Sequence, residues 1–431
     1  MKIGFVSLPL YGHLNPMTAL ARRLQSRGNE IVFLGVPDVE PFARAANLNF
    51  VPYAEKEYPI GTAGWEQVAK LHGREVIEYT FAELTPGLTK VAFEHLPQAI
   101  AKHGIEALVI DTAHFFIELI PMSLGIPYVH VWNVLNVDFS GTTPACLFSG
   151  PPDTTPEALA RNAEGLEWIG QFLGPLAEHF AMPYAAKTGL EIDWSNPAAT
   201  VSKLAVISQL PKEFDFPNIP WSPEFHYTGP FHDDRGREPI PFPWAKLDGR
   251  PLIYASMGTL VNGLEDVYKT ILKAVTPMSD FQVVLSVGHN VTIDRLRPIP
   301  SNVIVVPSAP QLELLKRATL CITHAGLNTT LESLAKGVPM VAIPIGYDQP
   351  GAAARIAYHG AGELIELEDL TVDRLSALIQ QVQTNPSYRE KARYFQEIIA
   401  KTRGLDRAAE VIEEAFEKSQ TLTSAPELSP V

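Results

Sequence analysis

Polar residues gather at two places in the second half of this 431-residue chain, each where a buried strand is expected to end. One group runs from His324 to Thr330, and the other is the pair Asp348 and Gln349. Ligands of open parallel sheets bind outside the carboxyl ends of the strands, so the two groups are expected to form one shared site. Gly326 leaves room for a ligand to approach the backbone, and the free N–H groups of the next helix favour an anion. The pattern predicts a diphosphate site that uses no metal.

A second pair of candidate residues stands in the first half of the chain. His13 lies in the segment YGHLNP, between a predicted strand and a helix expected over Met17–Arg27. Asn15 and Pro16 suit the N-cap and the first position of that helix. The positive end of the helix is expected to disfavour an imidazolium and so to keep the ring neutral. Asp111 ends the predicted strand ALVID, and parallel strands present one end to one rim, so it is expected near His13.

Simpler roles remain open for this pair. His13 also fits a turn histidine exposed to water, and Asp111 also fits an N-cap of a helix expected over Thr112–Leu124. His114 and Asp111 have the spacing of a metal pair, but no third residue of metal-ligand spacing is near them. No metal site is therefore predicted.

The stretch from Ser308 to Gly351, with the wording HAGLNT and then DQPGAAARIAYHG, resembles the nucleotide-sugar signature of the UDP-glycosyltransferase family, which is glycosyltransferase family 1. The wording is most similar to the bacterial branch of carotenoid (zeaxanthin) glucosyltransferases. YGHLNP, Asp111 and LGIP at 124–127 carry a weaker resemblance in the first half. The resemblance implies a GT-B fold, in which two Rossmann-like βαβ domains of α/β class face each other across a cleft. It also implies a glycosyltransferase that uses a UDP-sugar, with UDP-glucose the expected donor, and no cofactor or metal.

The resemblance implies roles for individual residues. His13 is the expected base that takes the proton of the acceptor hydroxyl while the anomeric carbon inverts, and Asp111 orients it. Glu332 is expected at the ribose, although Thr329 to Glu332 also fits a capping box. Asp348 and Gln349 are expected at the sugar hydroxyls, although a plain turn is the alternative. The residues expected to bind the donor are Thr259, Ser308, Ala309, Gln311, His324, Gly326, Asn328, Thr329, Glu332, Asp348 and Gln349.

The signature departs from the family pattern at two positions. Ser308 stands where the family often has a tryptophan that stacks on the nucleotide base, so Ala309 and Gln311 are expected to contact the base edge instead. This leaves uridine and thymidine both open. Leu327 stands where the plant enzymes have tryptophan, so bacterial relatives are the better comparison.

Aromatic residues in the first half suggest the acceptor. Residues 139–200 are rich in aromatic, proline and glycine residues, which fits either ordinary core or the wall of a hydrophobic cleft. The expected acceptor is a hydrophobic hydroxylated molecule such as a flavonoid, a phenol or a carotenoid. The candidate acceptor-binding residues are Phe115, Trp132, Phe148 and Phe172.

Composition excludes several classes of protein. The formal net charge of -14 argues against a nucleic-acid partner. Cys146 and Cys321 are the only cysteines, too few for a disulfide framework, and this indicates the cytoplasm. The start, MKIGFVSLPL, reads as a strand and its turn and not as a signal peptide. No apolar run approaches the about 20 residues of a membrane-spanning helix, so a substrate in a membrane would have to be reached by peripheral contact.

Hydrophobic patterning divides the chain into parts. Residues 1–230 are expected to form the N-terminal acceptor-binding domain, and the proline-rich residues 231–248 a stiff linker. Residues 249–400 are expected to form the C-terminal domain that binds the nucleotide sugar. By the resemblance, a helix over 401–418 packs back on the first domain. Residues 419–431 are expected to be disordered.

Two other functions remain open. A GT-B-like epimerase acting on a nucleotide sugar would explain the donor site, but it leaves the aromatic-rich first domain without a role. A non-catalytic nucleotide-sugar binder would not need His13 and Asp111 on one rim. A dinucleotide dehydrogenase is disfavoured because the first turn, LPLYGHLNP, lacks the GxGxxG pattern.

Overall fold

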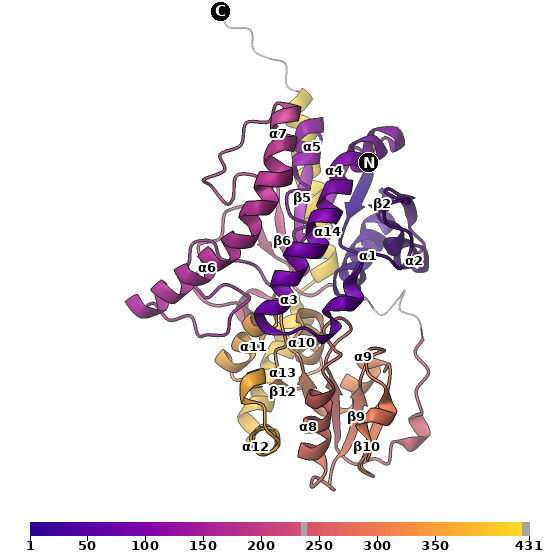
Figure 1. Cartoon of the computed structure of the whole chain (residues 1–431), viewed down its shortest axis with the longest axis vertical. Helices are drawn as coiled ribbons and strands as arrows, with labels where there is room; N and C mark the ends of the chain where they lie inside the picture. The colour runs from indigo at the N-terminus through magenta and orange to yellow at the C-terminus, as the bar shows by residue number, and fades with distance from the viewer. Residues whose placement is uncertain (234–238, 425–431) are drawn as a thin grey trace, which may run out of the picture.

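The computed structural model describes residues 1–233 and 239–424 and contains two parallel β-sheets, each flanked by helices. Figure 1 shows the first unit above the second. This confirms the predicted α/β class with two Rossmann-like halves. The first sheet has seven strands, in the spatial order β3 (Asn49–Pro52), β2 (Glu30–Gly35), β1 (Lys2–Val6), β4 (Ala107–Asp111), β5 (Tyr128–Trp132), β6 (Val206–Ser208) and β7 (Phe225–Tyr227).

The second sheet has six strands, and every neighbouring pair in both sheets is parallel. Central strands such as β4 are buried along their whole length, as expected where helices cover both faces of a parallel sheet. The spatial order is β10 (Val303–Val306), β9 (Gln282–Ser286), β8 (Leu252–Ser256), β11 (Ala318–Thr323), β12 (Met340–Ala342) and β13 (Gly362–Leu364).

The helices lie on both sides of each sheet (Figure 1). Those of the first unit are α1 (Tyr11–Ser26), α2 (Glu40–Ala45), α3 (Gly73–Tyr79), α4 (Thr85–His103), α5 (Leu119–Leu124), α6 (Pro156–Leu176) and α7 (Met182–Thr188). Those that follow are α8 (Glu265–Val275), α9 (Gln311–Leu315), α10 (Leu327–Ala335), α11 (Gln349–Tyr358), α12 (Val372–Thr384), α13 (Pro386–Lys401) and α14 (Gly404–Ser424). None of the helices in the described ranges is long and apolar enough to cross a membrane.

The order of strands reverses at the centre of each sheet. In the first sheet the chain moves outward from β1 to β3 and then returns to place β4 on the other side of β1. In the second sheet β8 and β11 stand in the same relation. Crevices form at such switch points, outside the carboxyl ends of the strands. The fold therefore offers one crevice in each half.

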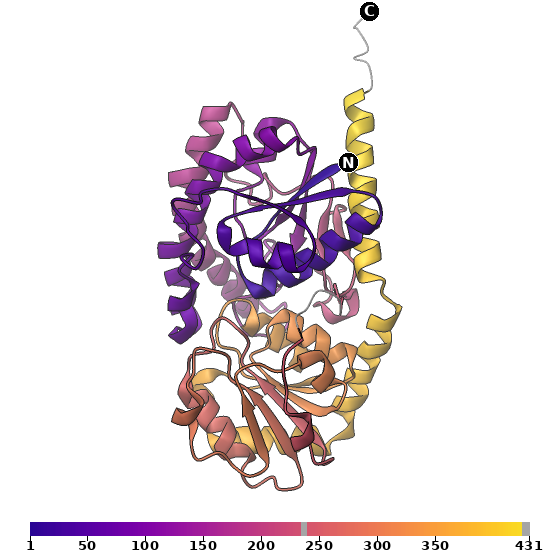
Figure 2. The same cartoon turned by 90° about the vertical axis from the view of Figure 1, so that its right-hand side faces the viewer.

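The last helix, α14, returns to the first unit. Ala408, Ile412 and Phe416 are buried with Leu20 and Leu24 of α1 in one hydrophobic core. Figure 2 shows this yellow helix running along the side of the upper unit. The helix reaches Ser424, so the prediction of disorder is wrong for residues 419–424, while residues 425–431 lie outside the described ranges. Extending a formed helix costs far less than starting one, which explains why it continues into a sequence with few apolar residues.

The segment around α3 joins the two units. Val68, Val76 and Ile77 are buried in the main hydrophobic core of the second unit. The backbone N–H of Gly73 donates to the carbonyl of Ile345 over 2.7 Å. Figure 1 shows α3 at the boundary between the units. These contacts hold the two rims opposite each other.

A buried ion pair holds the same boundary at another point. Nε and Nη2 of Arg355, in α11, lie 3.0 and 2.7 Å from Oδ1 of Asp215, in the segment between β6 and β7. Both side chains are at most 2% exposed. Removing one partner of such a pair would leave the other charge buried without compensation.

The predicted helix over Thr112–Leu124 is mostly wrong. Only α5, from Leu119, is helical, and the residues before it form turns. Phe116 has a φ of 65°, in the left-handed region that a right-handed helix cannot include. A helical start at Asp111 is therefore impossible, and so is its predicted role as the N-cap of that helix.

Candidate active site

His13 and Asp111 meet at the switch point of the first sheet. Nδ1 of His13 lies 2.8 Å from Oδ2 of Asp111, which ends β4, the strand beside β1. The carboxylate is fully buried, and the histidine side chain is 12% exposed. The sequence prediction of one shared rim thus agrees with the geometry. With Nδ1 bonded to the carboxylate, Nε2 is the ring nitrogen left for a substrate.

Helix α1 begins six residues earlier than predicted, at Tyr11, with Leu10 as its N-cap. His13 therefore lies in the first turn of the helix, and Pro16 lies inside the helix. Proline has no N–H and cannot bond the carbonyl four residues before it, which here belongs to Gly12. That carbonyl instead accepts a hydrogen bond of 2.8 Å from Nδ2 of Asn328, in the second unit. Pro16 therefore did not mark the start of the helix, because the carbonyl that it leaves without an N–H partner inside the helix bonds to the second unit.

The charges around His13 reverse the predicted effect of the helix end. Burial works to lower the pKa of His13, but the charge and hydrogen bond of Asp111 and the charge of Asp348 outweigh it, so the pKa is raised. Burial likewise works to raise the pKa of Asp111, but His13, the hydroxyl of Ser7 and the amide of Ala113 keep it lowered. The prediction of a ring kept neutral by the helix end did not include the two carboxylates, which raise the pKa of His13.

His324 occupies the switch point of the second sheet, directly after β11. An added Cβ at Gly258, after β8, would stand 2.5 Å from Nε2 of the His324 ring, and one at Gly326 would stand closer still. The ring itself thus fills the space that the sequence prediction assigned to a ligand beside Gly326. Burial lowers the pKa of His324 to about 4, so the ring is neutral at pH 7. Its Nδ1 has no hydrogen-bond partner within the described part of the chain.

The start of α10 follows His324. Its N-cap is Gly326, so the predicted capping box at Thr329 does not form, because Thr329 is already inside the helix. Nε2 of Gln311 donates instead to Oε2 of Glu332 over 2.6 Å and to Oγ1 of Thr329 over 3.2 Å. Three of the predicted donor-binding side chains therefore form one network at the end of β11.

Asp348 and Gln349 lie where α11 begins. Asp348 is the N-cap position of α11, and its Oδ2 accepts a hydrogen bond of 2.9 Å from the backbone N–H of Leu135, in the loop after β5. Burial raises the pKa of Asp348, with weaker opposing effects from this N–H and from His13. Oε1 of Gln349 accepts from the N–H groups of Ile345 and Gly346, at 2.8 and 3.0 Å. Gln349 thus holds its own loop, and Asp348 bonds to the first unit.

The remaining predicted donor residues stand at neighbouring strand ends. Ser308 and Ala309 follow β10, and Oγ of Ser308 lies 3.3 Å from Nε2 of His289. Thr259 is exposed in the turn after β8. All of the predicted donor-binding residues therefore lie at the carboxyl rim of the second sheet.

Three of the four predicted acceptor residues belong to one aromatic cluster. The ring of Phe81 is 5.4 Å from that of Phe115 and 5.7 Å from that of Phe172. Trp168 lies 4.8 Å from Phe172 and 5.5 Å from Phe148, which completes the cluster.

Phe81 is missing from the predicted acceptor-binding residues. It is an aromatic residue in the long segment between β3 and β4, and this could have suggested a place in the cluster. Trp132 makes no ring contact with the cluster among the described residues. Trp132 is the last residue of β5, whereas Trp168 and Phe172 belong to α6.

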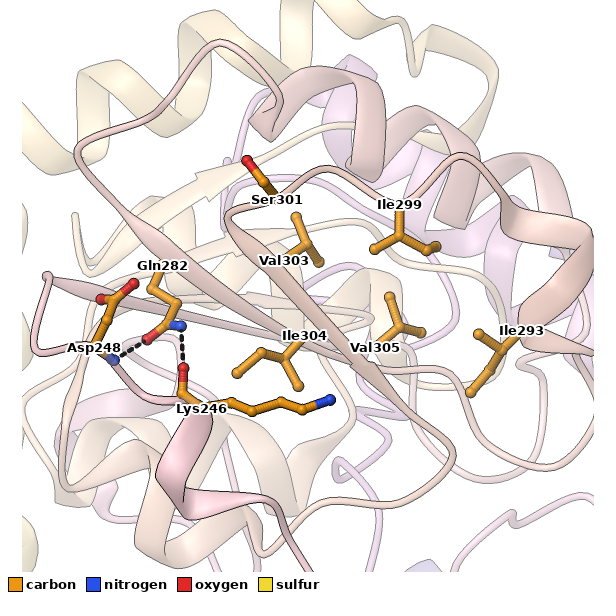
Figure 3. A pocket seen from close by; sticks show the side chains of 9 residues that line it. All are labelled: Lys246, Asp248, Gln282, Ile293, Ile299, Ser301, Val303, Ile304 and Val305. Atoms are coloured by element: carbon orange, nitrogen blue, oxygen red, sulfur yellow. Dashed lines mark hydrogen bonds between the residues drawn. The ribbon is translucent and has the colours of Figure 1, made fainter.

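A cavity of about 440 Å³ lies away from this site, beside the edge strand β10 (Figure 3). Figure 3 shows the Gln282 side chain bonded to the backbone of Lys246 and Asp248, at 2.7 and 3.0 Å. Gln282 opens β9, so this cavity reaches toward the amino ends of the strands. No predicted site residue lines it. In the described ranges, no group of three or more His, Cys, Asp or Glu is placed to hold a metal ion.

Known proteins resemble this chain both in sequence and in architecture. A family model described as UDP-glucoronosyl and UDP-glucosyl transferase matches residues 198–414, just over half of the chain. The zeaxanthin glucosyltransferase of Pantoea ananas is 26% identical over 436 residues, covering 97% of each protein. The NDP-glycosyltransferase YjiC of Bacillus subtilis (strain 168) is 27% identical over 424 residues, covering 97% of this chain and 98% of the relative.

Solved structures agree at the level of the fold. The glycotransferase of kitacinnamycin has a TM-score of 0.73 at 23% identity and covers 96% of this chain and 98% of its own. The glycosyltransferase VinC, in complex with DTDP, has a TM-score of 0.70 at 17% identity and covers 97% and 100%. Both similarities extend over both units, so the chain has the two-domain GT-B fold.

Proposed function

Because the chain belongs to the UDP-glucoronosyl and UDP-glucosyl transferase family, we propose that it is an inverting glycosyltransferase of hydrophobic alcohols and phenols. The donor is a UDP-sugar, with glucose as the expected sugar. The observation that carries this proposal is the contact of 2.8 Å between His13 and Asp111 on the rim that faces the second unit.

His13 acts as the base in this proposal. Nε2 takes the proton of the acceptor hydroxyl while that oxygen attacks the anomeric carbon, and the bond from this carbon to the diphosphate breaks. Asp111 stabilises the imidazolium that forms. The raised pKa of His13 suits a base that works near neutral pH, where general-base catalysis contributes about 10² to 10⁴ in rate.

The leaving diphosphate is received by the second rim. The free N–H groups at the start of α10 and the side chains of Asn328, Thr329 and Thr259 supply hydrogen bonds there. His324 is neutral at pH 7, so it contributes a hydrogen bond and no positive charge. In this proposal no metal ion is needed.

The rest of the donor extends along the same rim. Glu332 and Gln311 are already paired and offer the ribose a carboxylate and an amide. Asp348 and Gln349 bind the sugar hydroxyls, close to His13, whose pKa Asp348 helps to raise. The nucleotide base of the donor lies beside Ser308 and Ala309. Uridine and thymidine are both candidates, since the similar structure of VinC is a complex with DTDP.

The aromatic cluster of Phe81, Phe115, Phe148, Trp168 and Phe172 is the proposed acceptor wall. One relative is named for zeaxanthin, a hydrophobic alcohol, which fits such a wall. Flat, apolar rings bury large surfaces and favour acceptors with a large apolar surface.

An acceptor screen tests the proposal. The protein is incubated with UDP-glucose or dTDP-glucose and a panel of flavonols, simple phenols and carotenoid alcohols, and the products are scored by mass. A glucoside whose anomeric carbon has inverted, formed with acceptor-dependent release of nucleotide, is the expected result. An epimerised sugar formed without acceptor would favour the epimerase, and binding without turnover would favour the non-catalytic binder.

A further inference from the structure

We propose that Ser7 is a positioning residue for the proton transfer, because its hydroxyl holds the Asp111 carboxylate in the orientation that His13 requires. The inference rests on the proposed role of His13 as the base. Ser7 follows β1 directly and is 4% exposed. It is not one of the residues that the sequence singles out.

The register of the sheet brings Ser7 to Asp111. Val6, the last residue of β1, is opposite Ile110 in β4, so the next residue of each strand is Ser7 and Asp111. Oγ of Ser7 lies 2.8 Å from Oδ2 of Asp111 and donates its proton to it. Oδ2 of Asp111 also lies 2.8 Å from Nδ1 of His13. One carboxylate oxygen is thus shared between the serine and the histidine.

The other oxygen of the carboxylate is held as well. Oδ1 of Asp111 accepts a hydrogen bond of 3.2 Å from the backbone N–H of Ala113. Donors on both oxygens fix the torsion of the carboxylate before a substrate arrives. With this orientation fixed, Nδ1 of His13 is held as the N–H donor, and Nε2 keeps its lone pair for the acceptor proton. Removal of the Ser7 hydroxyl leaves the carboxylate free to rotate about its side-chain bond, held only by Ala113 and by the ring that it should orient.

The charged surroundings set the sign of the pH effect. The titratable groups that face this cluster are Asp348, from the second unit, and His114, from the loop after β4. Burial lowers the pKa of His114 to about 4, so it stays neutral in the assay range. Asp111 raises the pKa of His13 through its charge and its hydrogen bond, so a carboxylate that turns away from the ring stabilises the imidazolium less. The pH at which His13 loses its proton then falls.

The test compares Ser7→Ala with Ser7→Thr, which keeps a hydroxyl. For Ser7→Ala we expect kcat to fall about tenfold, the donor KM to stay within about twofold, and the acid limb of the kcat/KM profile to move to lower pH. Ser7→Thr is expected to restore most of the rate and the position of the limb. In an Asp111→Asn background, Ser7→Ala is expected to have no further effect, because the carboxylate through which it acts is gone.

A matched control removes another buried hydroxyl from a carboxylate in the same unit. Oγ1 of Thr200 lies 2.5 Å from Oε1 of Glu118, and neither side chain touches His13. Thr200→Val is expected to leave kcat and the pH limb unchanged. A Ser7→Ala variant that keeps the wild-type kcat and pH profile overturns the proposal, and so does a Ser7→Ala loss of equal size in the Asp111→Asn background.

A spectroscopic readout separates this inference from the proposed function. Nitrogen-15 NMR of the histidine rings is expected to show one His13 tautomer, protonated at Nδ1, in the wild-type protein and a mixture of tautomers in Ser7→Ala. An unchanged single tautomer in Ser7→Ala would contradict the positioning role, whether or not any acceptor is turned over. Lack of turnover in the wild-type protein with a single, Ser7-dependent tautomer would count against the proposed function alone.

Discussion

His13 and His324 stand at the switch points of the two sheets but have opposite electrostatic surroundings. His13 lies in the first turn of the helix after β1, and His324 directly follows β11. Burial works to lower the pKa of both rings. Next to His13, the carboxylates of Asp111 and Asp348 outweigh burial, and the pKa rises. Next to His324 stand Gly258 and Gly326, and the pKa falls to about 4. Topology therefore fixes where a histidine stands, and its neighbours decide whether it can take up a proton.

This difference divides the chemistry between the two rims. A ring with a raised pKa can accept a proton near pH 7 and hold the resulting charge beside a carboxylate. A ring that stays neutral can sit against a diphosphate as a hydrogen-bond donor without titrating during the reaction. The acceptor side is thus built for proton transfer and the donor side for binding.

The largest expected effect is that of removing His13, the proposed base. His13→Ala is expected to lower kcat by about 10² to 10⁴, because the acceptor hydroxyl loses its general base. His324→Ala is the matched variant, and it is expected to act mainly on the donor KM. Steady-state kinetics with UDP-glucose and one accepted phenol measure both. Unchanged turnover in His13→Ala would remove the base assignment, and equal effects on kcat in the two variants would end the division of roles.

Loss of the ion pair between the units is expected to destabilise the arrangement that sets the rims opposite each other. Asp215→Ala leaves the guanidinium of Arg355 buried without its partner, which costs about 3 to 5 kcal/mol of folding free energy. Urea unfolding followed by circular dichroism measures the loss. The control is Asp369→Ala, which breaks an ion pair with Arg374 whose side chains are both 56% exposed, and it is expected to change stability by less than about 1 kcal/mol. Similar losses in both variants would contradict a special role for the buried pair.

The two histidines should give opposite dependences of stability on pH. His324 has a folded pKa of about 4, below its ordinary value of 6.5, so the unfolded chain binds the extra proton between these values. Stability is therefore lost as the pH falls from about 6.5 to 4, by on the order of 3 kcal/mol. His13 has a raised pKa, so its contribution is present below about 6.5 and is lost as the pH rises through the folded value.

Denaturant unfolding from pH 4 to pH 8 checks this contrast. His324→Gln is expected to flatten the acid side of the stability curve, and His13→Gln the neutral side. Replacement of the exposed His179 by glutamine serves as the control. If both site variants changed the same side of the curve, the contrast between the rims would be wrong.

The smallest expected effect concerns the bond between the rims. Pro16→Ala restores an N–H that can bond the carbonyl of Gly12 within α1, so that carbonyl no longer depends on Asn328. A double-mutant cycle with Asn328→Ala, measured as UDP affinity by calorimetry, is expected to give a coupling of about 0.5 to 1.5 kcal/mol. Strictly additive effects would show that the bond from Asn328 to Gly12 contributes nothing to UDP binding.

Local chemistry explains what could be predicted from the sequence. Apolar runs such as ALVID predict buried strands, and the residues that follow them mark the rims, so His13, Asp111 and the donor residues appear at the right edges of the sheets. The start of α1, the turns before α5 and the helical end of the chain were out of reach. Phe116 adopts a left-handed backbone that its residue type does not predict. Pro16 lies inside a helix, and the carbonyl of Gly12 that it leaves free bonds to the distant Asn328.

The sequence by itself determined the two parallel sheets, their switch points and the chemical types of residue at each rim. Only the tertiary structure decided the charge states and the contacts between the halves. Asp111 is 98 positions from His13, and the bond from Asn328 to Gly12 spans 316. A pKa depends on burial and on the distance to other charges. No local pattern could therefore show that the pKa of His13 is raised and that of His324 lowered.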